Sequence, residues 1–234
     1  MTDPSATHPP AIACASTHCY AGGVAVLTGA ASGFGLEAAR MAARHGMRIV
    51  MADVQEQALH TAAAELKTQG AQVISVLTDV SDQDSVAALA QATLRAYGVP
   101  NLVFNNAGVA SGGLIWENTL TDWQWVLGVN LMGVVHGVRA FTPLMLEAAA
   151  KDPSWRGHLV NTASMAGLLS VPNSGIYNVS KHAVVTLTET LYHDLALVSD
   201  QVSCAVLCPF FVPTGISQSE RNRPNNLANE QPTR

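Results

Sequence analysis

The regular part of the chain alternates short, mostly apolar runs with longer segments whose apolar residues recur at helical spacing. The strand candidates are Val24–Leu27, Arg48–Ala52, Val73–Leu77, Leu102–Asn105, His158–Thr162 and Val202–Leu207. The helix candidates are Gly33–His45, Gln55–Gln69, Asp82–Tyr97, Thr121–Ala150 and Ser174–Ser199. Apolar strands without alternation indicate a sheet covered on both faces. The strand–helix alternation predicts an α/β fold of one domain, a Rossmann-like, doubly wound parallel sheet with helices on both faces.

Both ends of the chain lack this pattern. Residues 1–20 are rich in Pro, Ser, Thr and Ala and predict a flexible tail before a domain of residues 21–234. The tail contains His8, Cys14, His18 and Cys19, whose spacing matches no standard ligand pattern, so no metal site is predicted. Residues 218–234 are polar and rich in Asn and Pro, and predict a loop.

Composition narrows the possible partners. Charged residues make up 12% of the 234 residues, about half of the usual ~25%. This predicts surface hidden in a homodimer or homotetramer, with a weakly charged monomer as the alternative. The net charge of −5, without a basic run, argues against a nucleic-acid partner. No run reaches the ~20 apolar residues of a membrane span, so we expect no membrane partner and a cytoplasmic location. Cys204 and Cys208 are expected to be reduced core thiols.

A glycine-rich turn follows the first predicted strand, at Thr28-Gly-Ala-Ala-Ser-Gly-Phe-Gly35. A pyrophosphate must approach backbone N–H groups at a helix N-terminus, and glycines remove the side chains that would obstruct it. An ordinary glycine turn is the alternative, but the strand before and the helix after favour a dinucleotide site. The predicted contacts are Gly29, Ser32, Gly33, Phe34 and Gly35.

Asp53 ends the second predicted strand, where a carboxylate accepts hydrogen bonds from the adenosine ribose and repels a 2′-phosphate. Ser32 and Val54 occupy the places where a basic residue would help to bind that phosphate. The pattern therefore favours NAD over NADP. Capping of the helix that begins near Gln55 is a second role for Asp53, compatible with the first.

Tyr177 and Lys181 lie four residues apart and share one face of a predicted helix. A nearby ammonium and an oxidised nicotinamide favour the phenolate of a phenol whose reference pKa is ~10, so that it exchanges a proton with a substrate oxygen. An accidental pair is the alternative. Ser164 follows the fifth strand at the edge where such sheets bind ligands, and either contacts the substrate oxygen or caps a turn. Asn130 is unfavourable inside the predicted helix Thr121–Ala150.

Several segments resemble the short-chain dehydrogenase/reductase family through most of the chain after the tail. The spacing Thr-Gly-x3-Gly-x-Gly is similar to the family's cofactor turn, Asp79-Val80 to its acidic site beside the adenine, and Asn105-Asn106-Ala107-Gly108 to the segment closing its fourth strand. The interval from Ser164 to Tyr177 also resembles the family's. Further cofactor contacts implied by the resemblance are Asp79, Val80, Asn106, Ala107, Gly108, Tyr177, Lys181, Pro209 and Thr214.

The resemblance implies an NAD-dependent oxidoreductase that moves a hydride between the cofactor and a small, apolar secondary alcohol or ketone. Tyr177 would exchange the proton, Ser164 would hold the oxygen, Lys181 would bind the nicotinamide ribose, and Asn130 would help to hold a water. A non-catalytic dinucleotide sensor or scaffold is the alternative from another class. Such a protein need not keep all four residues, so their joint presence favours the enzyme.

The substrate end departs from the family pattern. Pro209 and Thr214 keep their places, but Phe210 replaces the usual glycine. Residues 209–234 are expected to form the substrate loop, and the chain is expected to lack the family's usual final helix and strand. The predicted substrate contacts are Ser164, Leu168, Tyr177 and Phe211, with Leu169, Ile216 and Ser111–Leu114 nearby, or else simple loop packing. Trp123, Trp125 and Leu191 are expected either in a dimer interface or in the core.

Overall fold

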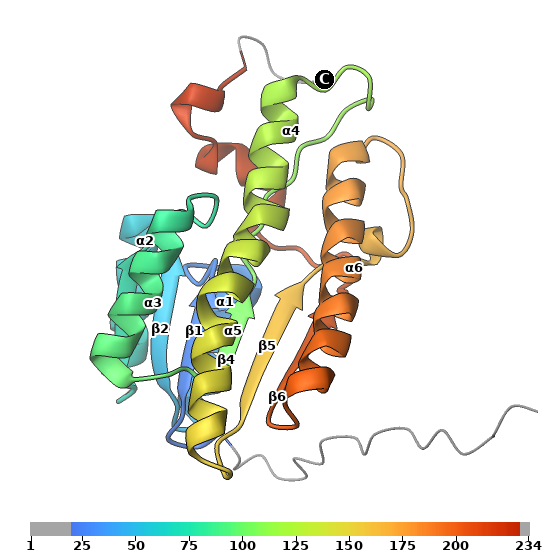
Figure 1. Cartoon of the computed structure of the whole chain (residues 1–234). Coiled ribbons are helices and arrows are strands. Elements are labelled where there is room, and N and C mark those ends of the chain that lie inside the picture. The colour runs from blue at the N-terminus through green and yellow to red at the C-terminus, as the bar shows by residue number, and fades with distance from the viewer. Residues whose placement is uncertain (1–19, 230–234) are drawn as a thin grey trace, which may run out of the picture.

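The computed structural model describes residues 20–229, so the histidines and cysteines of the N-terminal tail lie outside the described part. A six-stranded parallel sheet forms the centre of the molecule, in the order β3-β2-β1-β4-β5-β6 (Figure 1). The strands are β1 Val24–Thr28, β2 Arg48–Asp53, β3 Val73–Leu77, β4 Leu102–Asn105, β5 Gly157–Thr162 and β6 Val202–Leu207. Every strand matches a predicted one to within one residue at either end.

Helices cover both faces of the sheet, as the apolar strands predict. The helices are α1 Gly33–Arg44, α2 Glu56–Thr68, α3 Gln83–Tyr97, α4 Leu120–Leu127, α5 Gly133–Lys151 and α6 Gly175–Val198. One core cluster joins the sheet to α1 and α2, with Leu59 and Leu66 buried in it. A second cluster joins the opposite face to α3, α5 and α6 through Leu89, Phe141 and Leu195. The doubly wound fold is thereby confirmed.

β1 pairs with β2 on one side and with β4 on the other, so the direction in which successive strands are added reverses between β1 and β4. In open parallel sheets, ligands bind at such a switch point, beyond the carboxyl ends of the strands. The glycine turn follows β1, Asn106 follows β4 and Ser164 follows β5. The fold therefore brings the predicted site segments to one edge of the sheet.

The predicted helix Thr121–Ala150 is present as a continuous helical column, Leu120–Lys151, but this column is not α-helical throughout. A π-helical segment, Gly128–Met132, separates α4 from α5, and all three form one continuous column in Figure 1. Such segments are rare and occur often at functional sites. Gly133 follows it and packs against Val80, where an added Cβ would lie 2.7 Å from the Val80 side chain. The close approach brings this column against the loop after β3.

By length and composition alone, the column Leu120–Lys151 has the character of a membrane-crossing helix. In the structure, however, it packs along the sheet through Phe141, Met145 and Ala149, which are buried in the second core cluster. Trp125 is likewise buried in this chain's own core, with Val109, Val126 and Ile176, and Leu191 packs against the second core cluster. The column therefore packs as a helix of the protein core. Trp125 was expected either in a dimer interface or in the core, and it lies in the core.

The polar C-terminal segment was expected to be a loop, and among its described residues this was wrong for two short helical stretches. It forms two 3₁₀ turns, Gly215–Asn222 and Asn225–Leu227, which lie beside α4 at the red end of the chain in Figure 1. We call residues 214–229 the strap.

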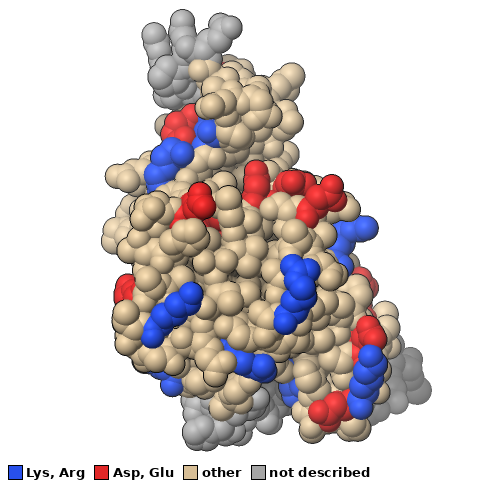
Figure 2. Space-filling model, turned by 90° about the vertical axis from the view of Figure 1, so that its left-hand side faces the viewer, with Lys and Arg blue, Asp and Glu red and all other residues tan. Residues whose placement is uncertain are grey.

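Charged side chains on the face in Figure 2 are scattered over an otherwise neutral surface, with no basic patch.

Candidate active site

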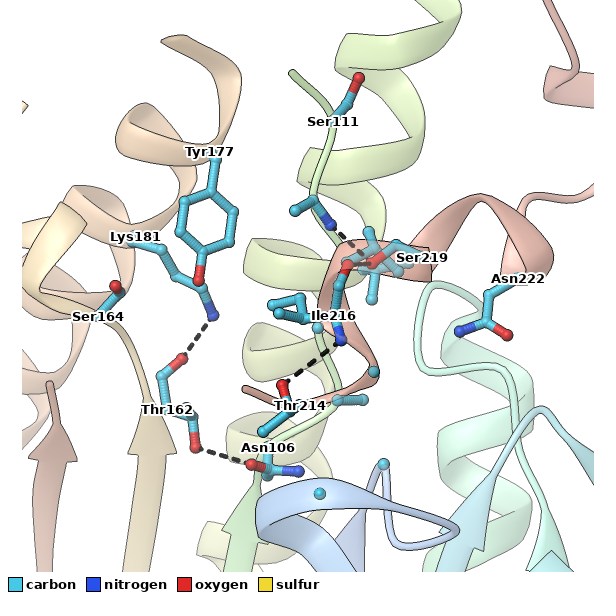
Figure 3. Close-up of a pocket in the computed structure, with 18 of the residues that line it drawn as sticks. Asn106, Ser111, Thr162, Ser164, Tyr177, Lys181, Thr214, Ile216, Ser219 and Asn222 are labelled. Carbon is cyan, nitrogen blue, oxygen red and sulfur yellow. Dashed lines mark hydrogen bonds between the residues drawn. The ribbon is translucent and has the colours of Figure 1, made fainter. Parts of the chain in front are cut away.

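A cavity of about 720 Å³ opens at the carboxyl edge of the sheet. It brings together most of the residues singled out in the sequence, and Figure 3 shows Tyr177, Lys181 and Ser164 at one side of it, across from Ile216 and Ser219 of the strap. The predicted site residues that line it are Gly29, Ser32, Gly33, Phe34, Asp53, Asp79, Val80, Asn106, Ala107, Gly108, Ser164, Tyr177, Lys181, Pro209, Phe211 and Thr214.

The glycine turn is built for close approach at the start of α1. Gly29 and Gly33 have φ of 63° and 54°, a conformation that L side chains rarely adopt. Gly35 lies beneath the turn, where an added Cβ would come 2.2 Å from the carbonyl oxygen of Gly29. Ser32 precedes α1 and makes no capping hydrogen bond with its side chain. A helix N-terminus with a bare glycine turn fits the diphosphate of a dinucleotide.

Asp53 fixes the turn as well as facing the cavity. Its carboxylate accepts hydrogen bonds from the backbone N–H groups of Ala31 (3.0 Å) and Gln55 (2.9 Å). Because α2 begins at Glu56, with Gln55 as its N-cap, the expectation that Asp53 caps this helix was wrong. The carboxylate instead joins the loop after β2 to the turn after β1, which places it beside the predicted diphosphate site.

Thr28, which was not predicted as a site residue, holds the segment after β4. The hydroxyl of Thr28 accepts hydrogen bonds from the N–H groups of Asn106 (2.9 Å) and Ala107 (3.1 Å), and the Asn106 amide donates to the Thr28 carbonyl (3.0 Å). Thr162 donates in turn to Asn106 (3.3 Å). These contacts align the ends of β1, β4 and β5.

Tyr177 and Lys181 share one face of α6 inside the cavity. The ammonium of Lys181 lies 5.6 Å from the centre of the Tyr177 ring and donates to the carbonyl of Thr162 (2.8 Å). Burial raises the pKa of Tyr177 above its ordinary value, and a hydrogen bond with Ser164 acts in the opposite direction. The expected lowering of this pKa is not produced by the protein groups alone, because desolvation of the phenol is the larger effect.

Ser164 caps a turn, which is one of the two roles considered for it, while its contact with a substrate oxygen stays a prediction. Its hydroxyl accepts from the N–H of Ala166 (3.1 Å) and so caps the 3₁₀ turn Met165–Gly167. Ser164 also lies on the same side of the cavity as Tyr177 (Figure 3), and it lowers the pKa of that phenol. A hydroxyl fixed by one hydrogen bond and near the phenol is suited to orient an oxygen that binds to both.

Asn130 is buried in the π-helical segment and does not line the cavity. Its side-chain oxygen accepts from the N–H of Val109 (2.8 Å), while its amide donates to the Val109 carbonyl (2.9 Å) and to Ser180 (3.0 Å). The side chain therefore joins the loop after β4 to α6, one residue before Lys181. These bonds use both N–H donors of the amide, and the water that Asn130 is expected to help hold stays a prediction.

Comparison with known proteins identifies the family to which this chain belongs. The family profile described as "short chain dehydrogenase" matches residues 23–225. The chain belongs to the short-chain dehydrogenase/reductase family. Members of this family are oxidoreductases, and the similar solved structures include complexes with NAD, with NADH and with 5-hydroxy-NADP.

Three relatives illustrate the similarity. A short-chain dehydrogenase/reductase from Burkholderia phymatum, solved in complex with NAD, is 56% identical with a TM-score of 0.89, over 92% of this chain and 75% of that one. The 1-deoxy-11-beta-hydroxypentalenate dehydrogenase of Streptomyces exfoliatus is 41% identical over 83% of this chain and 69% of that protein. An alcohol dehydrogenase from Thermococcus sibiricus, complexed with 5-hydroxy-NADP, is 28% identical with a TM-score of 0.76, over 84% and 80% of the chains.

Some predicted contacts of this short-chain dehydrogenase lie away from the cavity wall. Gly35 and Asn130 support it from behind, and Leu168 is 52% exposed outside it, whereas the neighbouring Leu169 lines it. Gly113 and Leu114 are also outside, although Ser111, Gly112 and Ile216 line the cavity. Lining residues that were not predicted to belong to the site include Val109, Trp125, Val171, Ser219, Arg221 and Leu227.

The charges in the cavity are few. Its charged lining residues are Asp53, Asp79, Lys181 and Arg221. Within residues 20–229, no group of three or more His, Cys, Asp or Glu side chains has the geometry of a metal site. Cys204 is buried and Cys208 half-buried, and both are free thiols. Cys208 lies close enough to Lys181 to affect the pKa of its ammonium.

Burial of Lys181 predicts a pH-dependent stability. Desolvation lowers the pKa of Lys181 from 10.5 to about 8, and the nearby Cys208 acts weakly in the opposite direction. Below pH 8 the folded protein holds a buried positive charge on Lys181. Between pH 8 and 10.5 this lysine is mostly neutral in the fold and charged in the unfolded chain, so the unfolded chain binds more protons. The free energy of unfolding therefore rises with pH over this range. We expect Lys181→Met to be more stable than the wild type at pH 6, by up to roughly 3 kcal/mol.

The measurement is urea unfolding of both proteins at pH 6 and above pH 10. The advantage of the methionine variant should shrink at the higher pH, because the wild-type lysine is then neutral in the fold. Lys151→Met, which removes an exposed ammonium on α5, should show no such pH dependence. Equal stability of Lys181→Met and wild type at both pH values would contradict the charged, desolvated state of Lys181.

Proposed function

We propose that this short-chain dehydrogenase transfers a hydride between NAD(H) and an apolar secondary alcohol or ketone, with Tyr177 as the proton donor and acceptor. The observation that carries the proposal is the convergence of Tyr177, Ser164 and Lys181 in one cavity with the glycine turn. Chance does not readily place a phenol, a hydroxyl and a buried ammonium together at the switch point of a dinucleotide fold.

Each residue has a chemical task in this proposal. Bound nicotinamide accepts or supplies the hydride. In the oxidative direction the phenolate of Tyr177 removes the hydroxyl proton of the substrate, and Ser164 orients the same oxygen with a hydrogen bond. The ammonium of Lys181 favours the phenolate electrostatically. Asn130 keeps the loop after β4 and α6 at a fixed separation through its three hydrogen bonds.

The cofactor preference is proposed from the charge around the adenosine ribose. Asp53 and Val54 line the cavity beside the turn, so a 2′-phosphate would meet a carboxylate and an apolar side chain. A carboxylate repels that phosphate and accepts bonds from a free 2′-hydroxyl. The B. phymatum relative was solved with NAD, which supports the same preference.

The substrate is proposed to be apolar because many of the residues that line the cavity are apolar. Val109, Trp125, Leu169, Val171 and Phe211 are among them, and none of them offers a charged partner. Pockets of this kind bind by burial of apolar surface, with a few polar groups to set orientation. A cytoplasmic homo-oligomer remains the proposed state of the protein, because low surface charge favours association.

The test is a panel of secondary alcohols and ketones of increasing apolar size, with formation or loss of reduced nicotinamide followed by absorbance. We expect turnover with NAD and a KM that falls by roughly fourfold for each added, fully buried methylene, about 0.8 kcal/mol. Binding of NAD without turnover across the panel would favour a dinucleotide sensor. Faster turnover of charged substrates than of apolar ones would contradict the proposed class.

The same panel tests the cofactor preference through Asp53→Asn. Asparagine loses the negative charge and keeps one oxygen, so it can accept from the N–H of Ala31 or of Gln55 but not from both. Loss of charged hydrogen bonds of ~1.5–3 kcal/mol should weaken NAD binding by about 10- to 100-fold, and NADP should gain relative to NAD. Asp200→Asn, which removes an exposed acidic charge outside the cavity, is the control. An unchanged ratio of NAD to NADP affinity in Asp53→Asn would remove the basis for the preference.

A further inference from the structure

A buried ion pair joins the strap to α4. The guanidinium of Arg223 lies 2.7 Å from a carboxylate oxygen of Asp122, and their side chains are 4% and 0% exposed. Taking two charges out of water is costly, and removing one partner leaves the other uncompensated. Any movement of the strap away from α4 would separate these two buried charges. The ion pair therefore favours one position of the strap against α4.

Further contacts surround the pair. Arg223 also donates to the carbonyl of Leu227 (2.7 Å) and to the side chain of Asn229 (3.2 Å), and its guanidinium lies 5.0 Å from the centre of the Trp125 ring. Asn229 donates to Asp122 (2.8 Å). Asp122 is itself fixed, because it forms a capping box with Thr119 at the start of α4. The arginine thus has partners on both α4 and the strap.

The pair persists at all physiological pH values. Burial opposes the charged form of Asp122, but hydrogen bonds from Thr119, Arg223 and Asn229 outweigh it and lower the pKa to about 2. The carboxylate is ionised above this value, so its attraction for Arg223 is lost only as the pH falls toward 2. The contact is therefore constitutive rather than a pH-sensitive switch.

The strap also crosses the cavity. Ser219 accepts a hydrogen bond from the N–H of Ala110 (3.1 Å), a contact drawn in Figure 3, and Asn222 accepts from the side chain of Gln55 before α2. Trp125 and Leu227, the two residues that Arg223 contacts on α4 and on the strap, both line the cavity. Arg223 therefore fixes the spacing of two apolar parts of the wall.

We propose that Arg223 and Asp122 latch the strap to α4, so that Trp125 and Leu227 form a fixed wall on the substrate side of the cavity. Arg223 is then a positioning residue that sets the affinity for substrate and leaves the chemical step to Tyr177, Ser164 and Lys181. This role rests on the proposed function, but the attachment of the strap is testable without any substrate.

The test uses Arg223→Met and Asp122→Asn, which stay close to the native side chains in size and each remove one charge of the buried pair. Hydrogen exchange should speed up within residues 214–229 by about 100-fold or more, as expected for a broken buried pair. Exchange in β1, β4 and β5 should be unchanged. With a substrate in hand, we expect KM to rise about 10-fold and kcat to change by less than about threefold.

Lys151→Met is the matched control, since it breaks an exposed ion pair within α5. If either main variant fails to fold, Asn229→Ala removes one donor to Asp122 and should give a smaller change of the same kind. Unchanged exchange in residues 214–229, or a fall in kcat at constant KM, would overturn the latch. If no substrate is found, the proposed reaction fails while the exchange result still decides whether the strap is latched.

Discussion

Replacement of Tyr177 by phenylalanine is expected to lower kcat by about 10³-fold while NAD still binds. General acid–base groups contribute about 10²- to 10⁴-fold to a rate, and no second phenol lines the cavity to replace this one. The ring of Tyr177 remains in the variant, so packing against Lys181 is preserved. The change therefore removes one hydroxyl and its proton, and little else.

The burial of Tyr177 sharpens this expectation. Because desolvation raises the pKa of the phenol, the oxidation rate should increase with pH until the phenolate predominates in the ternary complex. Rates of wild type and variant, measured with NAD from pH 6 to 10, should show this rise only in the wild type.

Tyr192 supplies the control on the same helix. It is 47% exposed and lies outside the cavity. Tyr192→Phe should keep the wild-type rate and pH profile. A Tyr177→Phe enzyme with full activity would refute the phenol as the proton donor, and the same result with a normal NAD affinity would direct attention to Ser164 or a bound water.

The fold was predictable because its signals are local and repeated. Each buried strand is a short apolar run, and each covering helix keeps its apolar period, so only the ends differ by a residue or two. The glycine turn, Asp53 and the Tyr177–Lys181 pair were predictable for the same reason. Their chemistry requires particular residues at fixed positions next to regular elements.

Contacts between distant segments account for what the sequence did not reveal. Thr28 holds the segment after β4 across 78 residues, and Asp122 pairs with Arg223 although nothing in the polar C-terminal sequence distinguishes that arginine. The π-helical segment is similar, because the residue that follows it, Gly133, packs closely against Val80 from a distant part of the chain. Asn130 was singled out as unfavourable in a helix, and its buried bonds to Val109 and Ser180 supply the compensation.

Substitution of Gly35 by alanine is expected to weaken NAD binding by at least about 100-fold and to destabilise the fold. Alanine is ordinarily the better helix former, by about 1 kcal/mol, so helix propensity alone predicts a gain in stability. An added Cβ at Gly35 would instead lie 2.2 Å from the carbonyl oxygen of Gly29. Relief of this clash requires the backbone of the turn to move.

The turn has little room to move. A Cβ built on Gly29 would lie 2.9 Å from the Cα of Ala107, so the backbone of Gly29 lies between α1 on one side and the segment after β4 on the other. Displacement of Gly29 therefore disturbs the hydrogen bonds that Thr28 makes to Asn106 and Ala107. Thermal unfolding with and without NAD, together with a fluorescence titration of NADH, measures both consequences.

Gly46→Ala separates the steric effect from a general cost of replacing glycine. Gly46 has φ of 70°, with nothing within 4 Å of an added Cβ, so alanine there should cost about 1 kcal/mol of stability through backbone strain and leave NAD affinity unchanged. Normal NAD binding by Gly35→Ala would mean that α1 shifts to accommodate the methyl group while the backbone of the glycine turn stays in place. The diphosphate would then depend on the positive φ of Gly29 and Gly33 rather than on the close packing beneath them.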